Sequence, residues 1–256
     1  MASVRTETSS GGTLLRLIVD KPKGNIFTAD VMSDLRLAVG EAASETELKL
    51  ITLEAAGKHF SFGASVEEHT RERVAEMLSG LTSLVMTICE SEVPVASLVQ
   101  GMCLGGAFEV VLASHFIFAA EDARMGVPEI RLGVFPPAAA ALLPKKASQA
   151  LADRMIISGE ELTGAELHTI GLVHRTYPAD SLRAGVDEWF DSTLGKFSAS
   201  SIRHATRNAR AHFTRRLEMR LKEHNQDYIE KLMATKDANE GIQAFIERRE
   251  PKWSNQ

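Results

Sequence analysis

Residues 93–120 alternate between apolar runs and a glycine-rich turn, and this pattern constrains the fold more than any other part of the chain. The segment reads VPVASLVQG, MCLGGAFEVVLASH and FIFAA in succession. We interpret the first and last runs as buried strands and the middle as a turn that opens a helix at Gly106. Strands joined through a helix lie parallel in one sheet, so the segment predicts an α/β fold.

The same alternation covers most of the chain. Apolar runs predict strands at residues 12–22 and 48–55, and a 3.6-residue period predicts helices at 28–45 and 71–91. These elements extend the parallel arrangement of strands with crossover helices.

The composition changes near residue 196, where charged helix-forming residues become frequent. We expect helical structure over 198–235 and a further short helix at 238–250. The sequence therefore predicts two regions, an α/β core over 1–195 that holds the site and a helical C-terminal region over 196–256.

Composition narrows the class of protein. The chain has 256 residues, 44% hydrophobic and 25% charged, with a net charge of −5, so nucleic acid and anionic membranes are not expected partners. No apolar run is long enough to span a bilayer, and residues 1–12 lack the apolar segment of a signal peptide. Cys89 and Cys103 lie in apolar contexts, as reduced thiols of a cytoplasmic protein would. Neither the cysteines nor the eight histidines show metal-ligand spacing, so no metal is expected.

Glu109 is the one charged residue in the apolar run that follows the glycine-rich turn. Burying a carboxylate is costly, so such a residue is either satisfied by structural partners or used in chemistry. Gly101, Gly105 and Gly106 leave backbone N–H groups at the start of the helix free to face a ligand. The spacing matches neither a dinucleotide fingerprint nor a phosphate-binding loop, and tight helix–strand packing is the alternative reading of the turn.

Two further stretches favour a catalytic site. Residues 57–69, GKHFSFGASVEEH, again place a glycine after a strand, and two such turns can donate amides to one developing negative oxygen. Residues 123–137, ARMGVPEIRLGVFPP, place Glu129 after a strand. With Glu109 it forms a pair of carboxyl groups that can divide acid and base roles.

These stretches belong to a set of six motifs that spans nearly the whole chain. Their sequences are DKPKGNIFTADVM, HFSFGAS, GMCLGGAFE, GVPEIRLGVFP, IISGEELTGAELHTIGLVHRTYP and TKDANEGIQAFIERREPKW. In this order they resemble the crotonase, or enoyl-CoA hydratase/isomerase, superfamily. The resemblance implies a spiral of ββα units with a C-terminal helical region that covers the site and joins subunits, in a homotrimer or homohexamer. It also implies an acyl-CoA thioester substrate, so CoA arrives with the substrate and no separate cofactor is expected.

The resemblance also implies roles for individual residues. The backbone N–H groups of Phe62 and Gly106 would hold the thioester oxygen, while Glu109 and Glu129 would activate water and deliver a proton. Three residues around the second turn are expected to contact CoA: Lys58, Phe60 and Ala64. For Lys58, whose place suits a CoA phosphate, a plain surface lysine is the alternative. Two features are predicted to stay outside the chemistry, because the cluster Glu67–His69 suits a solvated helix face and Phe245 suits a core or interface position.

Departures from the usual family pattern point to the acyl group. Phe62 stands where alanine is common, and FPPAAA at 135–140 replaces a glycine pair and should stiffen the start of a helix. Three stretches taken together, KPKGN, FSFGASVEEH and FPPAAA, are most similar to the hydratases of cyclohexa-1,5-diene-1-carbonyl-CoA in anaerobic aromatic degradation. The expected activity is therefore that of a hydro-lyase with this substrate. A general enoyl-CoA hydratase, an enoyl-CoA isomerase and a non-catalytic CoA-binding subunit are the alternatives.

Overall fold

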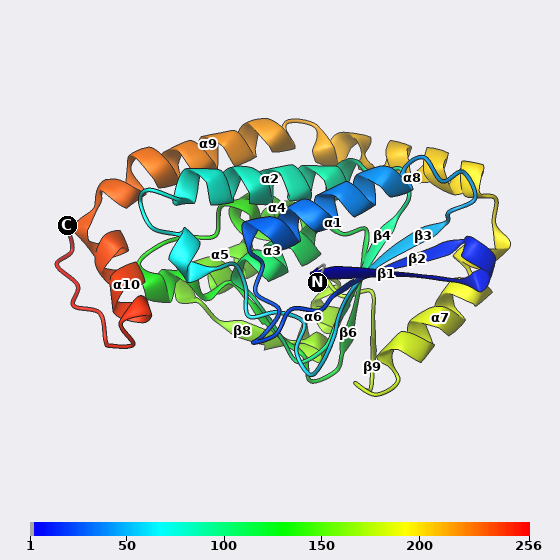
Figure 1. Cartoon of the computed structure of the whole chain (residues 1–256), viewed down its shortest axis with the longest axis horizontal. Coiled ribbons are helices and arrows are strands. Elements are labelled where there is room, and N and C mark those ends of the chain that lie inside the picture. The colour runs from blue at the N-terminus through cyan, green and yellow to red at the C-terminus, as the bar shows by residue number, and fades with distance from the viewer. Residues whose placement is uncertain (1–2) are drawn as a thin grey trace.

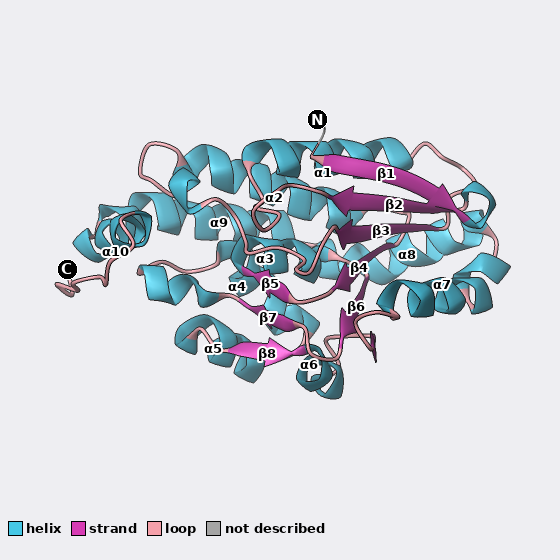
Figure 2. Ribbon diagram, turned by 60° about the horizontal axis from the view of Figure 1, so that its bottom comes forward, coloured by secondary structure: helices cyan, strands magenta, loops and turns pink. Residues whose placement is uncertain are grey.

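Two β-sheets form the framework of the computed structural model, which describes residues 3–256 (Figures 1 and 2). The larger sheet has the strand order β1-β2-β3-β4-β6-β9, and the smaller has the order β5-β7-β8. The strands are β1 (Val4–Ser9), β2 (Leu14–Val19), β3 (Leu50–Ala55), β4 (Val95–Val99), β5 (Met102–Leu104), β6 (Phe116–Ala120), β7 (Arg124–Gly126), β8 (Glu161–Thr163) and β9 (Arg175–Tyr177).

Parallel pairing dominates the larger sheet. Only β1 pairs antiparallel with its neighbour β2, whereas β2–β3, β3–β4, β4–β6 and β6–β9 are all parallel. After β4 the chain makes a short strand, β5, in the smaller sheet before the next helix, and after β6 it makes β7 there in the same way. This repetition of strand, strand and helix confirms the α/β spiral of ββα units that the sequence predicted.

The helices cover the sheets and extend beyond them (Figure 1). They are α1 (Ala29–Ala42), α2 (Val74–Glu90), α3 (Gly105–Ala113), α4 (Pro137–Lys146), α5 (Gln149–Ser158), α6 (Gly164–Ile170), α7 (Leu182–Ser192), α8 (Ala199–Thr214), α9 (Leu217–Glu230) and α10 (Lys236–Ile246). The helices expected at 28–45 and 71–91 are confirmed as α1 and α2. Among the described residues, no helix is long and apolar enough to cross a membrane.

Two short 3₁₀ helices, η2 (Val66–Glu68) and η3 (Pro128–Leu132), lie beside the site. The expected helical stretch 198–235 forms α8 and α9, separated at Arg216, whose φ of +64° places it in the left-handed region. This left-handed conformation is uncommon for a non-glycine residue. At Arg216 it breaks the helical path after α8 and redirects the chain into α9.

The C-terminal helices share the main core with the α/β region. Leu217, Leu221 and Tyr228 of α9 are buried in the same hydrophobic cluster as Leu84 and Val85 of α2. Figure 1 shows α9 running beside α2, with α10 at the end of the molecule farthest from α7. The C-terminal region therefore completes the core, and it brings α9 and α10 close to the glycine-rich turns.

Cys89 and Cys103 are both buried free thiols, in line with the sequence reading. Burial raises the pKa of each thiol, to about 11 for Cys89. The part of the chain that the structure describes holds no group of three or more His, Cys, Asp or Glu side chains placed to bind a metal ion.

Candidate active site

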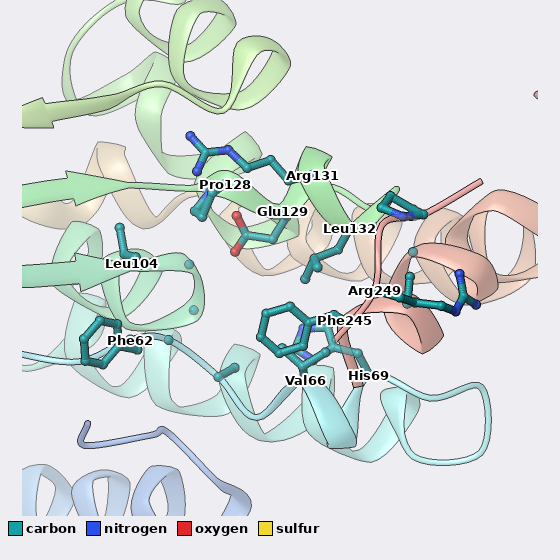
Figure 3. Close-up of a pocket in the computed structure, with 17 residues that line it drawn as sticks. Phe62, Val66, His69, Leu104, Pro128, Glu129, Arg131, Leu132, Phe245 and Arg249 are labelled. Carbon is teal, nitrogen blue, oxygen red and sulfur yellow. The ribbon is translucent and has the colours of Figure 1, made fainter. Parts of the chain in front are cut away.

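A cavity of about 400 Å³ opens between the two glycine-containing turns, η3 and α10. Figure 3 shows the Glu129 carboxylate in its middle, between Leu104 on one side and Phe245 of the C-terminal segment on the other. The lining is mainly apolar apart from Glu129, Arg131, His69 and Arg249. We call this space the outer cavity.

A much smaller inner chamber, with a volume of about 10 Å³, continues from the outer cavity into the core. Four residues line both spaces and mark the junction: Ala64, His69, Gly106 and Glu129. Eight residues line only the inner chamber: Met77, Leu78, Leu81, Glu109, Phe135, Pro136, Pro137 and Tyr228. A group that reaches the inner chamber therefore passes the two turns. It meets mainly apolar walls with four polar side chains, His69 and Glu129 at the junction and Glu109 and Tyr228 on the inner wall.

The turn before α3 presents backbone donors to the junction. α3 begins at Gly105, and no side chain caps its first turn, so the N–H of Gly106 is free to face a ligand. A Cβ placed on Gly106 would lie 2.9 Å from the Ala64 Cβ and 3.4 Å from the Ala64 nitrogen. The two turns are therefore in contact, and glycine is needed where they meet.

The prediction for the Phe62 amide is wrong. Its N–H donates to the carbonyl oxygen of Gly24 at 3.1 Å, so it is occupied within the fold. The following residue is occupied as well, since the Gly63 N–H donates to the Ser61 hydroxyl at 3.0 Å. Within residues 3–256 the Ala64 N–H has no acceptor, and it lies against Gly106. Ala64, expected only as a CoA contact, therefore supplies the second free amide of the junction.

Phe62 takes a different place from the one expected. Its ring is 45% exposed and lines the outer cavity, where Figure 3 shows it beside Leu104. A Cβ on Gly24 would lie 2.5 Å from the ring, so the loop that accepts the Phe62 amide also supports its side chain. Phe62 thus shapes the entrance with its side chain and leaves the oxygen-binding role to another backbone group.

Glu109 is held by the start of α4. Its side chain is 2% exposed, and the N–H groups of Ala138 and Ala139 donate to its Oε1 at 2.7 and 2.8 Å. Pro136 and Pro137 begin this helix without N–H groups, so the first donors it offers are the two alanines. The FPPAAA segment therefore positions the carboxylate in addition to stiffening the helix.

Burial raises the pKa of Glu109 to about 7, and the two backbone hydrogen bonds lower it. Because the amides stabilise the charged form, Glu109 is the member of the pair that ionises more readily. It is therefore suited to accept a proton near neutral pH.

Glu129 has the opposite environment. It lies on η3 and is 8% exposed, and its Oε2 is buried without a hydrogen-bond partner among the described residues. Burial, and then the charge of Glu109, hold its pKa well above its ordinary value. Gly105, at φ +52°, allows the approach, because a Cβ there would lie 2.8 Å from Glu129 Oε1. Glu129 is therefore suited to carry a proton when Glu109 is ionised.

Two of the predicted CoA contacts lie outside the cavity lining. Phe60 is buried against Phe27, with ring centroids 6.4 Å apart, and its N–H donates to the Gln100 carbonyl. Its side chain is therefore part of the core. Lys58 is exposed on the loop before Phe60, and a contact with a CoA phosphate stays a prediction.

Sequence reasoning assigned Glu68 and His69 to the wrong class, and of the two only His69 lines the cavities. The solvated helix face is wrong for Glu68, which is buried, and for His69, which lines both spaces. His69 Nδ1 lies 2.8 Å from the Ser65 carbonyl oxygen, and burial lowers the pKa of its ring. Phe245 also lines the outer cavity. The position of Phe245 in the C-terminal motif was the available signal for that residue. His69 was noticed only as part of the charged cluster Glu67–His69, for which a place at the pocket was the less favoured interpretation.

The opposite protonation states of the two glutamates predict a bell-shaped pH dependence. Glu109 must be ionised to accept a proton, so activity should fall as pH drops through a pKa of about 7. Glu129 must be protonated to donate, so activity should also fall as pH rises through its raised pKa. The measurement is kcat/KM as a function of pH. The two apparent pKa values of this profile describe the coupled pair of glutamates together. A flat profile over the range in which the protein stays folded would contradict these roles.

Two free amides facing a pair of buried carboxyl groups define a class of enzyme that stabilises a negatively charged oxygen and moves protons beside it. The chain belongs to the enoyl-CoA hydratase/isomerase family, whose model matches residues 10–256. It is 44% identical over 244 residues to cyclohexa-1,5-dienecarbonyl-CoA hydratase of Thauera aromatica, covering 95% of this chain and 94% of that protein.

More distant relatives agree with the family. A probable enoyl-CoA hydratase of Bacillus subtilis is 28% identical over 253 residues, covering 94% of this chain and 95% of that protein. Among solved structures, an enoyl-CoA hydratase from Mycobacterium avium subsp. paratuberculosis K-10 is 26% identical with a TM-score of 0.86, covering 99% of both chains. The fold is thus that of this family.

Proposed function

We propose that the chain is a hydro-lyase that adds water to cyclohexa-1,5-diene-1-carbonyl-CoA and forms 6-hydroxycyclohex-1-ene-1-carbonyl-CoA. The observation that carries the reaction type is the pair of buried carboxyl groups with opposed environments beside two free amides. The choice of acyl group is supported by the identity to the Thauera aromatica hydratase, which bears this substrate in its name.

The amides of Ala64 and Gly106 bind the thioester oxygen at the junction. As water attacks the β-carbon of the ring, negative charge moves onto this oxygen, and fixed N–H donors stabilise it there without reorganising. Removing one such donor from an enzyme costs about 10²–10³-fold in kcat, so two aligned amides contribute substantially to the rate.

Glu109 and Glu129 handle the protons. The ionised Glu109, oriented by the start of α4, takes a proton from the water as its oxygen bonds to carbon. The protonated Glu129 supplies the proton that the dienolate needs. The mainly apolar lining of the outer cavity, with a volume of about 400 Å³, suits a flat hydrocarbon ring.

A direct comparison of substrates tests this assignment. The purified protein is expected to show a kcat/KM for cyclohexa-1,5-diene-1-carbonyl-CoA at least about 100-fold above that for crotonyl-CoA, because the mainly apolar outer cavity, with Phe62 at its entrance, suits a ring. The readout is the decay of conjugated absorbance together with the gain of one water in the mass of the product.

The other outcomes separate the alternatives. Equal or better turnover of crotonyl-CoA would assign the chain to the general enoyl-CoA hydratases. A product of unchanged mass with a shifted double bond would indicate an isomerase. Binding of the thioester without conversion of either substrate would indicate a CoA-binding subunit.

We further infer a cytoplasmic homotrimer or homohexamer. Large apolar side chains remain exposed on the C-terminal region of a single chain, and they are Phe197, Met219, Ile229, Phe245, Ile246 and Trp253. Such exposed groups favour burial against another subunit. The two buried free thiols are consistent with a reducing compartment.

A further inference from the structure

Tyr228 of α9 and Glu129 of η3 each bury an oxygen atom that no group of the protein satisfies. Tyr228 is 1% exposed and packs beside Phe135, with ring centroids 5.4 Å apart. The Tyr228 hydroxyl and the Glu129 Oε2 have no hydrogen-bond partner among residues 3–256. Buried polar atoms of these kinds normally have one, so a polar group from outside the chain is needed to complete them.

The inner chamber, which both residues line, has the size of a water site. Its volume is about 10 Å³. A cavity of about 10–15 Å³ is enough for one water molecule if two to four polar groups surround it. The chamber is therefore too small for a substrate ring, and its four polar side chains supply the partners that a single water needs.

The hydroxyl of Tyr228 determines the direction of the hydrogen bonds. Burial, and then the charges of Glu129 and Glu109, raise the pKa of Tyr228, so the phenol keeps its proton and acts as a donor. A water that accepts this hydrogen can direct its own hydrogens toward acceptors. Because Glu129 Oε2 is a buried acceptor without a partner, the chain of hydrogen bonds runs from the phenol through the water to this oxygen.

This arrangement makes the two oxygens of Glu129 different. Oε1 lies against Gly105, where a Cβ would be 2.8 Å away, and Gly105 lines only the outer cavity. A water that donates to Oε2 leaves the carboxyl proton on Oε1, on the side where the substrate binds. The same hydrogen bond stabilises the negative charge that remains on Glu129 once the proton has been given away.

We propose that Tyr228 is a positioning residue that holds one water in the inner chamber and thereby keeps the Glu129 proton on the oxygen facing the outer cavity. The proposal rests on the function proposed above, in which Glu129 is the acid. This water is separate from the one that is consumed. The reacting water lies against the substrate in the outer cavity, whereas Tyr228 lines only the inner chamber.

A high-resolution crystal structure of the unliganded protein tests the water site directly. We expect one ordered water within about 2.6–3.2 Å of both the Tyr228 hydroxyl and the Glu129 Oε2. In Tyr228→Phe this water should be absent or should have moved away from residue 228. A wild-type chamber without a water, or with one that contacts neither oxygen, would overturn the proposal. This measurement needs no substrate, so it is independent of the proposed function.

The kinetic test compares Tyr228→Phe with Tyr177→Phe. The chain has two tyrosines, and Tyr177 on β9 lines neither space, so it is the matched control. In Tyr228→Phe we expect kcat to fall about tenfold, because the charge on Glu129 loses part of its stabilisation. KM should stay within about threefold of wild type, since Tyr228 does not touch the substrate. The loss should be similar for the cyclic dienoyl-CoA and for crotonyl-CoA, because both need the Glu129 proton. Tyr177→Phe should match wild type.

The pH profile gives a readout that a packing role would not change. Without the phenol the ionised form of Glu129 is less stable, so its pKa rises further. The upper limb of kcat/KM in Tyr228→Phe should therefore move to higher pH by about one pH unit. The lower limb should move less, because backbone amides hold Glu109 in both proteins. The maximal rate thus falls while the active pH range widens.

The other titratable or charged side chains around Glu129 are the same in both proteins. Those that line the two spaces, besides Glu109 and Tyr228, are His69, Arg131 and Arg249. Burial lowers the pKa of the His69 ring, and the two arginines pair with Glu161 and Glu240. A shift of the upper limb in the variant therefore reports the loss of the phenol.

The remaining outcomes separate the proposal from its alternatives. A lower rate with an unchanged upper limb would make Tyr228 a packing residue. Wild-type rate and pH profile in Tyr228→Phe would remove the link between the phenol and Glu129. A wild-type protein that hydrates neither thioester would refute the proposed function itself, whereas the crystal structure would still decide whether the chamber binds water.

Discussion

Glu109→Gln is expected to lower kcat by about 10²–10⁴-fold, the range typical for the loss of one acid–base group. Glutamine keeps the size of the side chain, and its oxygen can still accept from the Ala138 and Ala139 amides. It has no basicity, so the water is no longer deprotonated. The binding of substrate should persist, because the Ala64 and Gly106 donors are backbone groups. The measurement is kcat in parallel with the Kd of a non-reactive acyl-CoA.

A matched control lies close to the site. Glu67→Gln changes the same residue type on η2, where the side chain is exposed and lines neither space. We expect its kcat to stay within about twofold of wild type, as is usual for surface substitutions. A Glu109→Gln enzyme that turns over at a rate close to that of Glu67→Gln would exclude Glu109 as the base.

Deletion of residues 196–256 is expected to give an insoluble or inactive chain. The deletion removes Leu217, Leu221 and Tyr228 from the main core, and burial of each such side chain contributes about 1.5–3 kcal/mol. It also removes α10 and Phe245 from the wall of the outer cavity. The newly exposed faces of α2 and α4 should then cause aggregation.

Solubility, activity and mass in solution measure this outcome. Light scattering should give the intact protein a mass of three or six times 27.9 kDa. The truncated chain should be found mainly in the insoluble fraction. A soluble and active monomer from the truncation would show that the C-terminal region is neither part of the folding unit nor needed for assembly.

The strands and helices that the sequence revealed are those with a strong apolar period. Strand β1 (Val4–Ser9) was missed because its sequence, VRTETS, has almost no apolar residues. The strand lies at the exposed edge of the sheet. It exists because β2 pairs with it along its whole length, from Val4 opposite Val19 to Ser9 opposite Leu14. Pairing between strands overrode local propensity there, and no single-chain pattern contains that information.

Part of the candidate site could also be predicted from the sequence. Glu109 and Glu129 were found because a carboxyl group in an apolar context is conspicuous. The free amide of this turn was predicted at Phe62 and is found two residues later, at Ala64. In a stretch of consecutive backbone N–H groups, sequence does not tell which one is already bonded, and here the carbonyl of Gly24 decided it. Tyr228 was missed for a different reason, since only the path of α9 brings it to a site made by residues far away in the chain.

The unpartnered polar atoms of the inner chamber also affect the balance between the activity and the stability of the protein. Each buried oxygen without a partner, such as Glu129 Oε2 or the Tyr228 hydroxyl, disfavours the folded state by about 1–3 kcal/mol. That is a notable share of the free energy of unfolding of a typical domain, which is about 5–15 kcal/mol. Polar groups at these positions therefore stabilise the core less than well-packed apolar side chains would. Laboratory selection for heat resistance alone should therefore favour apolar replacements at these positions, at the expense of turnover.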